Sequence, residues 1–561
     1  MGPHPTVVPS GMVEQATERR LAGDWRGACA AARVDVDFDL VAVRLAHGDE
    51  VADRVTDDLR HLVPDLLRWH LPRRAGDGLL RTGLCFPLAL HPRGYALSAR
   101  TPAVDGRPQR IALRFTRLQD VPAWARDDSL LYLREHWDAR LTGDLMARCG
   151  GVTRLPFFTA DGRALPDGAP AGTDPESLVE RLIRLDDSGR HADAWTSAGI
   201  ELQVLLFDPV WGRDRIDPAA FDARLPTGER DRVRREVVDR SLAWLRPLHT
   251  TLVDAARRLR AGPLPVDDWS GCLRIDLRGR CIVLDRLESP RPRARLVGRV
   301  PYEQVDAARW RTEAAAFRVG LPRVPRLPHV LVRRPPVLAA LLAGRLRPDD
   351  LHPAVRAALF PGWSATPPAA LPALRERIRV ECDQATHEVL MRDGAVVVSH
   401  PPATTRRERV IAALGGPVQG CVAAHDGWRD PTVRMPRRMR GLRADLLNLV
   451  AHGDSWAVAE ALDRGLDPHV RDPRGRTLLH LLPWLSDVDL LPRLLAAGLD
   501  VDARDAWGET PLHSAVEHGS PDLVRALLAD GADRHARSRL PYPRVATSTI
   551  RADLHFLWRG H

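Results

Sequence analysis

The stretch DAWGETPLHSAV, Asp505–Val516, has the order of a tight turn followed by the first turn of a helix. Gly508 suits the positive φ that such a turn requires, while Thr510 and Pro511 are typical of a helix cap and of the first helical residue. His513 falls three residues after the cap, where a side chain can bond back to the cap. We therefore expect this imidazole to brace a turn rather than to take part in a reaction.

The same order occurs 33 residues earlier, in DPRGRTLLHLLP, which begins at Asp472. Its glycine, threonine and histidine are Gly475, Thr477 and His480. The period of 33 also relates Gly465, Gly498 and Gly531. A period of this length is typical of stacked units that each consist of a turn and two helices. The sequence therefore predicts three such units, with both histidines in structural roles.

Residues Asp505–Ala532 resemble the ankyrin repeat, because they match the pattern DxxGxTPLHxA…GxxxxVxxLLxxGA almost throughout. The resemblance covers Leu442–Arg537, and we expect TSTIRADLHFLW, up to Trp558, to form a C-terminal capping helix. The middle unit departs from the pattern at Pro483 and Pro492, which predicts a bent or shortened helix there. Three units are close to the minimum that buries a continuous core, so the array is expected to lean on the preceding part of the chain.

The resemblance also implies a binding surface, since ankyrin arrays bind partners through a concave face made of turn tips and first helices. Trp507 is the strongest candidate, because it lies at a loop tip and Trp and Arg dominate binding hot spots. The alternative is that Trp507 packs against a neighbouring turn or an upstream unit, and packing is the favoured role for Trp484. The predicted partner-binding residues are Arg474, Arg476, Trp484, Arg504, Trp507, Glu509, Glu517 and His518.

The rest of the chain gives a coarser outline, that of an α+β multidomain protein ending in an all-α helical solenoid of ankyrin type. We expect a helical region at 1–75, a β-rich region at 76–172, a mixed α/β region at 173–375, a small α+β unit at 376–432 and the ankyrin domain at 440–561. Hairpins are predicted around AVDGRP, in GCLRIDLRGRCIVLDRL and in HEVLMRDGAVVVSH. TTRRERVIAALGG is predicted to be a helix and GCVAA a strand.

Composition excludes several enzyme classes. All 82 basic residues are arginine, so the lysines of a P-loop, a protein kinase or a Schiff-base enzyme are absent. The cysteines are odd in number and contain no Cys-x-x-Cys pair, so we expect reduced, buried side chains with no metal site and no cofactor. They are Cys29, Cys85, Cys149, Cys272, Cys281, Cys382 and Cys421. No leader-like or membrane-spanning run is evident, so we expect a cytoplasmic protein without membrane contact.

Charge is unevenly distributed, because Arg440–Arg534 carries a net −6 and the remainder +15. The densest basic runs, Arg68–Arg74 and Arg434–Arg443, could contact phosphates, but no stacking aromatics interleave with them. We favour a solvated linker or helix face, or for the second run contact with the acidic repeats. VDVDFDL, Val34–Leu40, lacks the glycine and the distal acid of an EF-hand loop and is read as a solvated edge.

These features favour a non-enzymatic scaffold or adaptor that binds an unidentified protein partner through the ankyrin array. One alternative is that residues 1–430 form an enzyme which the repeats direct to its substrate, and its sign would be convergent His, Asp, Glu or Cys side chains. A second alternative, which we do not favour, is nucleic-acid binding through Arg434–Arg443.

Overall fold

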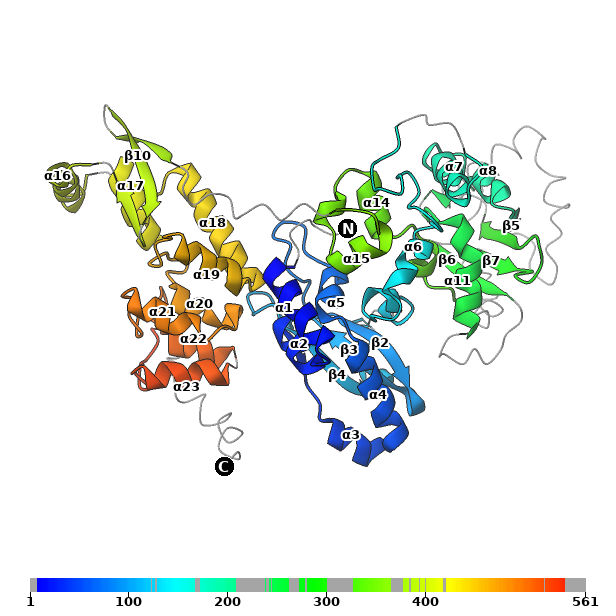
Figure 1. Cartoon of the computed structure of the whole chain (residues 1–561), viewed down its shortest axis with the longest axis horizontal. Helices are drawn as coiled ribbons and strands as arrows, with labels where there is room; N and C mark the ends of the chain where they lie inside the picture. The colour runs from blue at the N-terminus through cyan, green and yellow to red at the C-terminus, as the bar shows by residue number, and fades with distance from the viewer. Residues whose placement is uncertain are drawn as a thin grey trace, which may run out of the picture.

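The computed structural model describes residues 8–539 apart from 123, 127–128, 167–171, 208–237, 239–241, 244, 262–271, 278–279, 300–325, 365–376, 383–384, 393, 399, 417–419 and 519. As expected, the protein mixes helices and strands, and its C-terminal repeats are helical. The C-terminal helices and a small sheet lie at one end of the long axis, the N-terminal sheet in the middle and a third sheet at the other end (Figure 1). Among the described residues, no helix combines the length and apolarity needed to cross a membrane.

The N-terminal sheet has the strand order β1-β4-β3-β2. Its strands are β1 (Val34–Val36), β2 (Cys85–His91), β3 (Tyr95–Arg100) and β4 (Ile111–Arg117). β3 and β4 form the antiparallel hairpin predicted around AVDGRP, while β1 pairs with β4 in parallel. The accompanying helices are α1 (Ser10–Leu21), α2 (Trp25–Ala31), α3 (Leu40–His47), α4 (Asp49–His61) and α5 (Pro64–His70).

One apolar core joins these helices to the sheet. In α4, Val51, Val55 and Leu59 recur every four residues, so they form one buried stripe, and this stripe belongs to the same core as Leu97 and Leu113 of the sheet. The boundary expected between residues 75 and 76 therefore falls inside a single core, because β1 completes the sheet that later residues build.

The aspartates of VDVDFDL are engaged separately from one another. Nε of Arg110 donates to Asp35 Oδ2 at 2.7 Å, and Asp37 pairs with Arg114 at 3.2 Å. Asp39 caps α3 by accepting from the backbone N–H of Val41 at 3.0 Å. The partly exposed edge strand thus uses its carboxylates in local ion pairs and a cap.

The sheet at the end of the molecule away from the repeats also has four strands, in the order β5-β8-β7-β6 (Figure 1). Its strands are β5 (Glu201–Phe207), β6 (Leu273–Leu277), β7 (Arg280–Asp285) and β8 (Arg293–Arg299). β6 and β7 form the hairpin predicted in GCLRIDLRGRCIVLDRL. The helices of this part of the chain are α6 (Leu145–Arg148), α7 (Pro175–Asp187), α8 (His191–Ser197), α11 (His249–Ala261), α13 (His329–Val332), α14 (Pro336–Leu342) and α15 (Pro353–Leu359).

The small α+β unit is an antiparallel sheet followed by two helices. Its strands, in the order β11-β10-β9, are β9 (Ile378–Cys382), β10 (Ala385–Arg392) and β11 (Ala395–Val398). The β10–β11 hairpin and helix α16 (Pro402–Ala413) occur as predicted. The prediction of a strand at GCVAA is wrong, because these residues begin α17 (Gly420–Arg429). Cys421, Ala424 and Trp428 are buried at helical spacing, which gives α17 one apolar face.

The C-terminal region is a stack of three successive helix pairs (Figure 1). The pairs are α18 (Arg437–His452) with α19 (Ser455–Asp463), α20 (Leu478–Leu485) with α21 (Leu490–Ala496), and α22 (Pro511–Glu517) with α23 (Pro521–Ala529). α21 has seven residues where α23 has nine, as expected for a shortened helix, whereas α20 contains Pro483 and still spans eight. The predicted capping helix lies outside the described residues.

The stack shares its apolar core with the small α+β unit. Met391 of the sheet, Trp428 of α17 and Leu446, Leu478 and Leu512 of the repeats belong to one buried cluster. At the junction the Trp428 indole N–H donates to the Asp467 carbonyl at 3.0 Å. The array thus rests on the preceding unit, as its small number of repeats led us to expect.

Candidate functional site

The turn tips of the array are shaped by two aspartates at equivalent positions. Oδ1 of Asp505 accepts from the backbone N–H groups of Trp507 at 2.9 Å and Glu509 at 2.8 Å. Asp472 makes the same pair of bonds in the preceding unit, at 2.9 Å each. Gly508 at φ +74° completes the turn with a backbone conformation that other residues rarely adopt. Each turn is therefore closed by its own carboxylate.

Both signature histidines brace their helix caps. In each repeat the threonine N–H donates to Nδ1 of the histidine three residues later, at 3.2 Å for Thr477 and His480 and at 3.1 Å for Thr510 and His513. Nε2 of His480 also donates to the Glu509 carbonyl of the next repeat at 3.0 Å. Burial lowers the pKa of His480 to about 4, so its ring is neutral near pH 7. This histidine therefore joins two repeats as well as capping a helix.

Two arginine side chains, Arg471 and Arg504, which are also 33 residues apart, connect successive turns. Nη1 of Arg471 donates to the Arg504 carbonyl at 3.0 Å. Nη1 of Arg504 in turn donates to the carbonyls of Gly508 at 3.0 Å and Arg537 at 2.9 Å. The Arg504 side chain, which was predicted to contact a partner, is thus engaged within the array and helps to fix the turn that carries Trp507.

Arg474 and Trp507 occupy equivalent turn tips and meet each other. The Arg474 guanidinium carbon lies 4.6 Å from the centroid of the Trp507 ring, within the range of a cation–π contact. Trp507 is nevertheless 41% exposed, and Arg474 is exposed as well. The backbone beneath is anchored, since Arg539 N–H donates to the Trp507 carbonyl at 2.7 Å. We call Arg474 and Trp507 the tip patch.

Two of the predicted partner-binding residues, Trp484 and His518, lie at helix ends and contact each other. Trp484 is only 7% exposed, because its ring packs between His518, at 4.3 Å between centroids, and the Arg476 guanidinium at 4.8 Å. Burial lowers the pKa of His518 to about 4. Trp484 therefore packs within the array, the favoured reading from the sequence.

The N-terminal sheet contacts this end of the array through the loop between β3 and β4. Nη1 of Arg107 donates to the Glu517 carbonyl at 2.7 Å, and Nη1 of Arg110 donates to Ser486 Oγ at 2.8 Å. Sequence patterns did not indicate these contacts, which bring together residues 410 and 376 positions apart. The chain itself thus binds one carbonyl at the edge of the expected partner surface, while Glu517 stays exposed.

A second set of contacts fixes the first repeat to the N-terminal sheet. Arg33, which is 7% exposed, donates to the Gly453 carbonyl from Nη2 at 2.8 Å and from Nε at 3.2 Å. Nε2 of His452 lies 3.1 Å from the Asp77 carbonyl, to which it can donate. A side chain at position 453 would not fit, since its Cβ would lie 2.7 Å from Arg33 Nε. The approach of the two units thus depends on glycine here.

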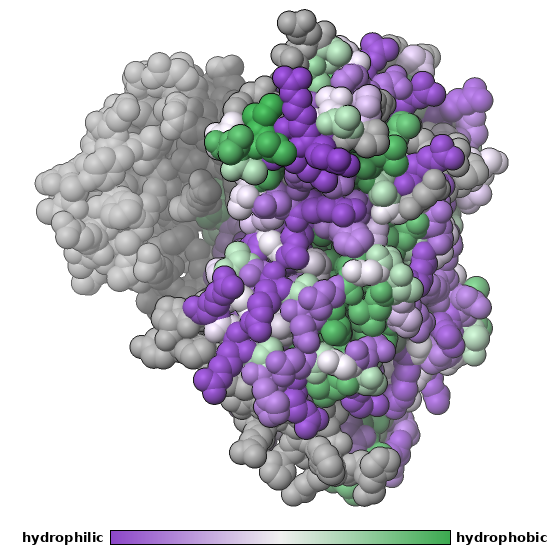
Figure 2. Space-filling model, turned by 90° about the vertical axis from the view of Figure 1, so that its left-hand side faces the viewer, coloured by the Kyte–Doolittle hydropathy of each residue, from purple (hydrophilic) through white to green (hydrophobic). Residues whose placement is uncertain are grey.

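The outer side of the C-terminal region is an ordinary solvated surface. Seen from the end of the molecule where α16, α17, α21 and α23 lie, hydrophilic residues predominate, with hydrophobic residues in patches between them (Figure 2). Arg493 of α21 pairs with Asp463, and Arg525 of α23 with Asp522. These exposed ion pairs contribute little to stability, and they are typical of helix faces that contact water.

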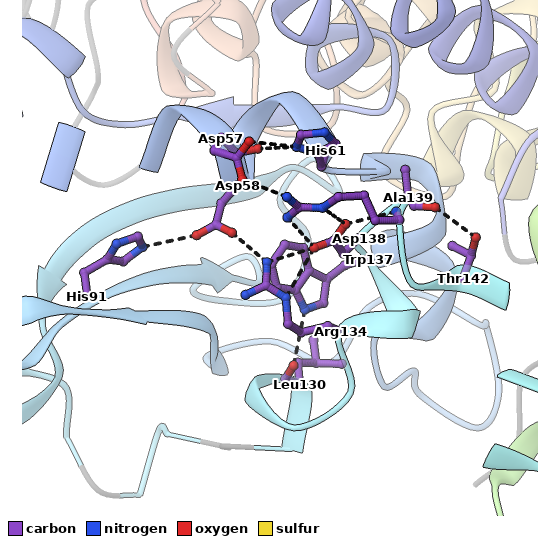
Figure 3. Close-up of polar contacts among 11 residues, drawn as sticks. Asp57, Asp58, His61, His91, Leu130, Arg134, Trp137, Asp138, Ala139 and Thr142 are labelled. Carbon is purple, nitrogen blue, oxygen red and sulfur yellow. Dashed lines mark hydrogen bonds and ion pairs between the residues drawn. The ribbon is translucent and has the colours of Figure 1, made fainter. Parts of the chain in front are cut away.

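The densest polar cluster of the N-terminal sheet unit is an ion network (Figure 3). Asp138, fully buried, accepts from Arg134 and Arg140, each at 2.8 Å, and Arg134 also donates to Asp58 at 2.7 Å. His91 lies 3.3 Å from the other oxygen of Asp58. Burial acts to raise the pKa of Asp138, but hydrogen bonds from Arg140 and Arg134 outweigh it and hold the pKa below its usual value. These pairings favour a structural role over the acid–base site that the enzyme alternative requires.

The two basic runs differ in exposure. Arg68 is 2% exposed and donates to the Ala32 carbonyl at 3.0 Å, so the expectation of a solvated face is wrong for this residue. Burial lowers its pKa well below the usual arginine value. In the second run, four arginines are exposed and form no ion pair with the repeats in the part of the chain described: Arg434, Arg437, Arg438 and Arg440. These four arginines are therefore solvated, whereas Arg443, the last of the run, is half-buried and donates to the Gly427 carbonyl at 3.2 Å.

The structure also brings together four residues that the sequence analysis did not connect. Cys382, His387, His400 and Cys421 meet in the small α+β unit. The intervals between them follow no familiar metal-binding spacing, so no local motif could have indicated the cluster.

The comparisons with known proteins concern the C-terminal region. A family model described as "Ankyrin repeats (3 copies)" matches residues 446–538. No curated protein matches the chain. Ankyrin repeats in general bind other proteins. Together with the stacked helix pairs, the repeated turns and the paired caps, this match shows that residues 446–538 of the protein are an array of three ankyrin repeats.

Proposed function

We propose that this protein is a scaffold or adaptor whose ankyrin array binds a partner protein through the tip patch, Arg474 and Trp507. The observation that carries this proposal is the exposure of Trp507, a large aromatic side chain, on a turn that is otherwise closed by hydrogen bonds. Tryptophan and arginine are the residue types that most often dominate binding energy at protein interfaces.

The rigidity of the patch supports the same function. Asp505 and Arg504 hold the turn of Trp507, and Arg474 stacks on the indole ring. Side chains that are ordered before binding lose little conformational entropy on binding, so more of the contact energy appears as affinity.

Two contacts within the chain support a smaller partner surface than the one expected from the sequence. Trp484 is buried beside His518 and Arg476, and Arg107 donates to the Glu517 carbonyl. We therefore propose that the partner binds at the turn tips of the array, and that Glu509, which is half-buried, contributes to the rim of this surface.

Affinity capture followed by titration with the captured protein tests this function. Arg474→Ala with Trp507→Ala should weaken binding by about 30-fold or more, the equivalent of one hot spot worth about 2 kcal/mol. The matched control is Trp124→Ala with Arg525→Ala, which removes an exposed tryptophan and an exposed arginine elsewhere. Equal binding by the tip variant and the control variant, at unchanged melting temperature, would show that the patch is not the binding surface.

A further inference from the structure

Two cysteines and two histidines converge between the small sheet and α17. Cys382 ends β9, His387 lies in β10, His400 lies between β11 and α16, and Cys421 is in the first turn of α17. One nitrogen or sulfur atom from each side chain lies within 4.8 Å of the corresponding atom of every other. The same four types of ligand make up a Cys2His2 zinc site. Here two lie in strands β9 and β10, one follows β11 and one lies in helix α17.

The distances suit a tetrahedral zinc ion. Sγ of Cys421 lies 3.7 Å from Nδ1 of His387. With the usual Zn–S and Zn–N bond lengths, the sulfur–nitrogen edge of a tetrahedron measures about 3.6 Å. The two imidazoles are perpendicular, with 4.2 Å between ring centroids, so the rings do not stack on each other.

His400 is the second observation that points to a ligand. Its side chain is 1% exposed, and neither ring nitrogen makes a hydrogen bond among the residues described. Burying a polar group without a hydrogen bond is unfavourable, so the imidazole calls for a partner. Oε1 of Glu408 lies 3.5 Å from Nδ1, where a carboxylate would orient the ring of a histidine that binds metal through Nε2.

The backbone beside Cys382 is shaped around its sulfur atom. The N–H of Cys421 points at Cys382 Sγ with a separation of 2.9 Å, and a hydrogen bond of this kind stabilises a thiolate. Gly420 has φ +57°, and a Cβ there would lie only 2.3 Å from the same sulfur. Glycine therefore allows the helix to begin close enough to the strand for both sulfurs to face one point.

We propose that Cys382, His387, His400 and Cys421 bind one Zn²⁺ ion. On binding, each cysteine thiol releases its proton to solvent and each thiolate donates an electron pair to zinc, so the two negative charges balance the ion and leave the site neutral. Thiolate and imidazole ligands favour zinc over magnesium or calcium. The proposal replaces the expectation, drawn from the sequence, that the protein has no metal site.

Four protein ligands make this a structural rather than a catalytic site, because no coordination position is left for a substrate or water. The ion would connect all the strands of the small sheet to α17. The same helix carries Trp428, which bonds to Asp467 of the first ankyrin repeat. Zinc would thus hold together the unit on which the array rests.

Metal analysis of the full-length chain tests the site. The purified wild-type protein should contain one zinc per chain, and X-ray absorption should show two sulfur atoms at about 2.3 Å and two nitrogen atoms at about 2.0 Å from the metal. Cys421→Ser and His400→Ala should each lower the zinc content severalfold. Cys281→Ser is the matched control, because it changes a buried cysteine of β7 and should keep the full content.

Two outcomes would overturn the proposal. One is wild-type protein that takes up no zinc after incubation with the ion under reducing conditions, with both thiols still open to alkylation. The other is bound zinc whose absorption spectrum lacks sulfur ligands, or whose content is the same in the two ligand variants and the wild type. The absorption measurement uses only wild-type protein, so it decides the question even where a variant fails to fold.

Discussion

His480 should make the stability of the ankyrin array depend on pH. The side chain is fully buried, and burial lowers its pKa from 6.5 to about 4. In the unfolded array the ring takes up a proton below pH 6.5, whereas in the folded array it does so only near pH 4. The contribution of the neutral ring to stability is therefore complete above pH 6.5 and is lost progressively as the pH falls towards 4.

The size of the effect follows from these two pKa values. Each unit of difference is worth about 1.4 kcal/mol, so protonation of the unfolded state removes about 2.5 kcal/mol of stability between pH 7.5 and pH 4.5. For helix α20, which contains His480, this corresponds to a loss of about 70-fold in the protection of its amides from hydrogen exchange, after correction for the intrinsic rates.

Hydrogen exchange measured by mass spectrometry at the two pH values can isolate this contribution. His480→Gln places a residue that suits the capping box but does not titrate. On acidification, the free energy of protection of α20 should therefore fall by about 2.5 kcal/mol less in this variant than in the wild type. His535→Gln, which changes an exposed histidine of the same array, should behave as the wild type does. If the wild type and His480→Gln lose equal protection, burial of the imidazole is not what links this helix to pH.

Three further predictions concern contacts between units. Arg33→Leu leaves the Gly453 carbonyl without its two bonds and should lower exchange protection at the C-terminal end of α18 by about 1–3 kcal/mol; unchanged protection there would show that this contact contributes nothing. Trp428→Phe removes the donor to the Asp467 carbonyl and should lower the free energy of unfolding in urea by a similar amount. An unchanged free energy of unfolding would show that this bond does not stabilise the junction. Asp138→Asn removes the shared charge, although Arg134 keeps Asp58 and Arg140 keeps Asp57, so we expect thermal melting to show a loss of about 1–3 kcal/mol. Unchanged stability would contradict the network in Figure 3.

The ankyrin array could be predicted from the sequence because its signals are local. The turn glycine, the threonine cap and the bracing histidine lie within six residues. The bonds that hold them are equally local, because the Thr510 N–H donates to His513 and the Glu509 N–H donates to Asp505. Hairpins with short Asp-Gly turns were predicted for the same reason. The error at GCVAA arose because four or five apolar residues fit a strand or a helix equally well, and the choice depends on Trp428, seven positions after Cys421, which extends the buried face of α17.

The exposure of the predicted partner-binding residues could be predicted only in part, because it depends on which other parts of the chain pack against each residue. The sequence placed Trp507 at a loop tip and favoured packing for Trp484. In the structure Trp507 is 41% exposed, while Trp484 contacts His518 and Arg476 and is 7% exposed. Arg504 is exposed, as expected of a surface charge, but the sequence did not indicate that its guanidinium bonds to two carbonyls of the array.

The sequence by itself determined the repeats, their caps and their order, because those depend on interactions between residues a few positions apart. Only the tertiary structure decided that Arg33 donates to a carbonyl 420 positions away. It also decided that one side-chain atom from each of four residues lies within 4.8 Å of the others: Cys382, His387, His400 and Cys421. Such long-range contacts depend on how whole helices and sheets pack against one another. Because the free energy of packing comes from many buried contacts at once, the spacing of residues along the chain does not predict them.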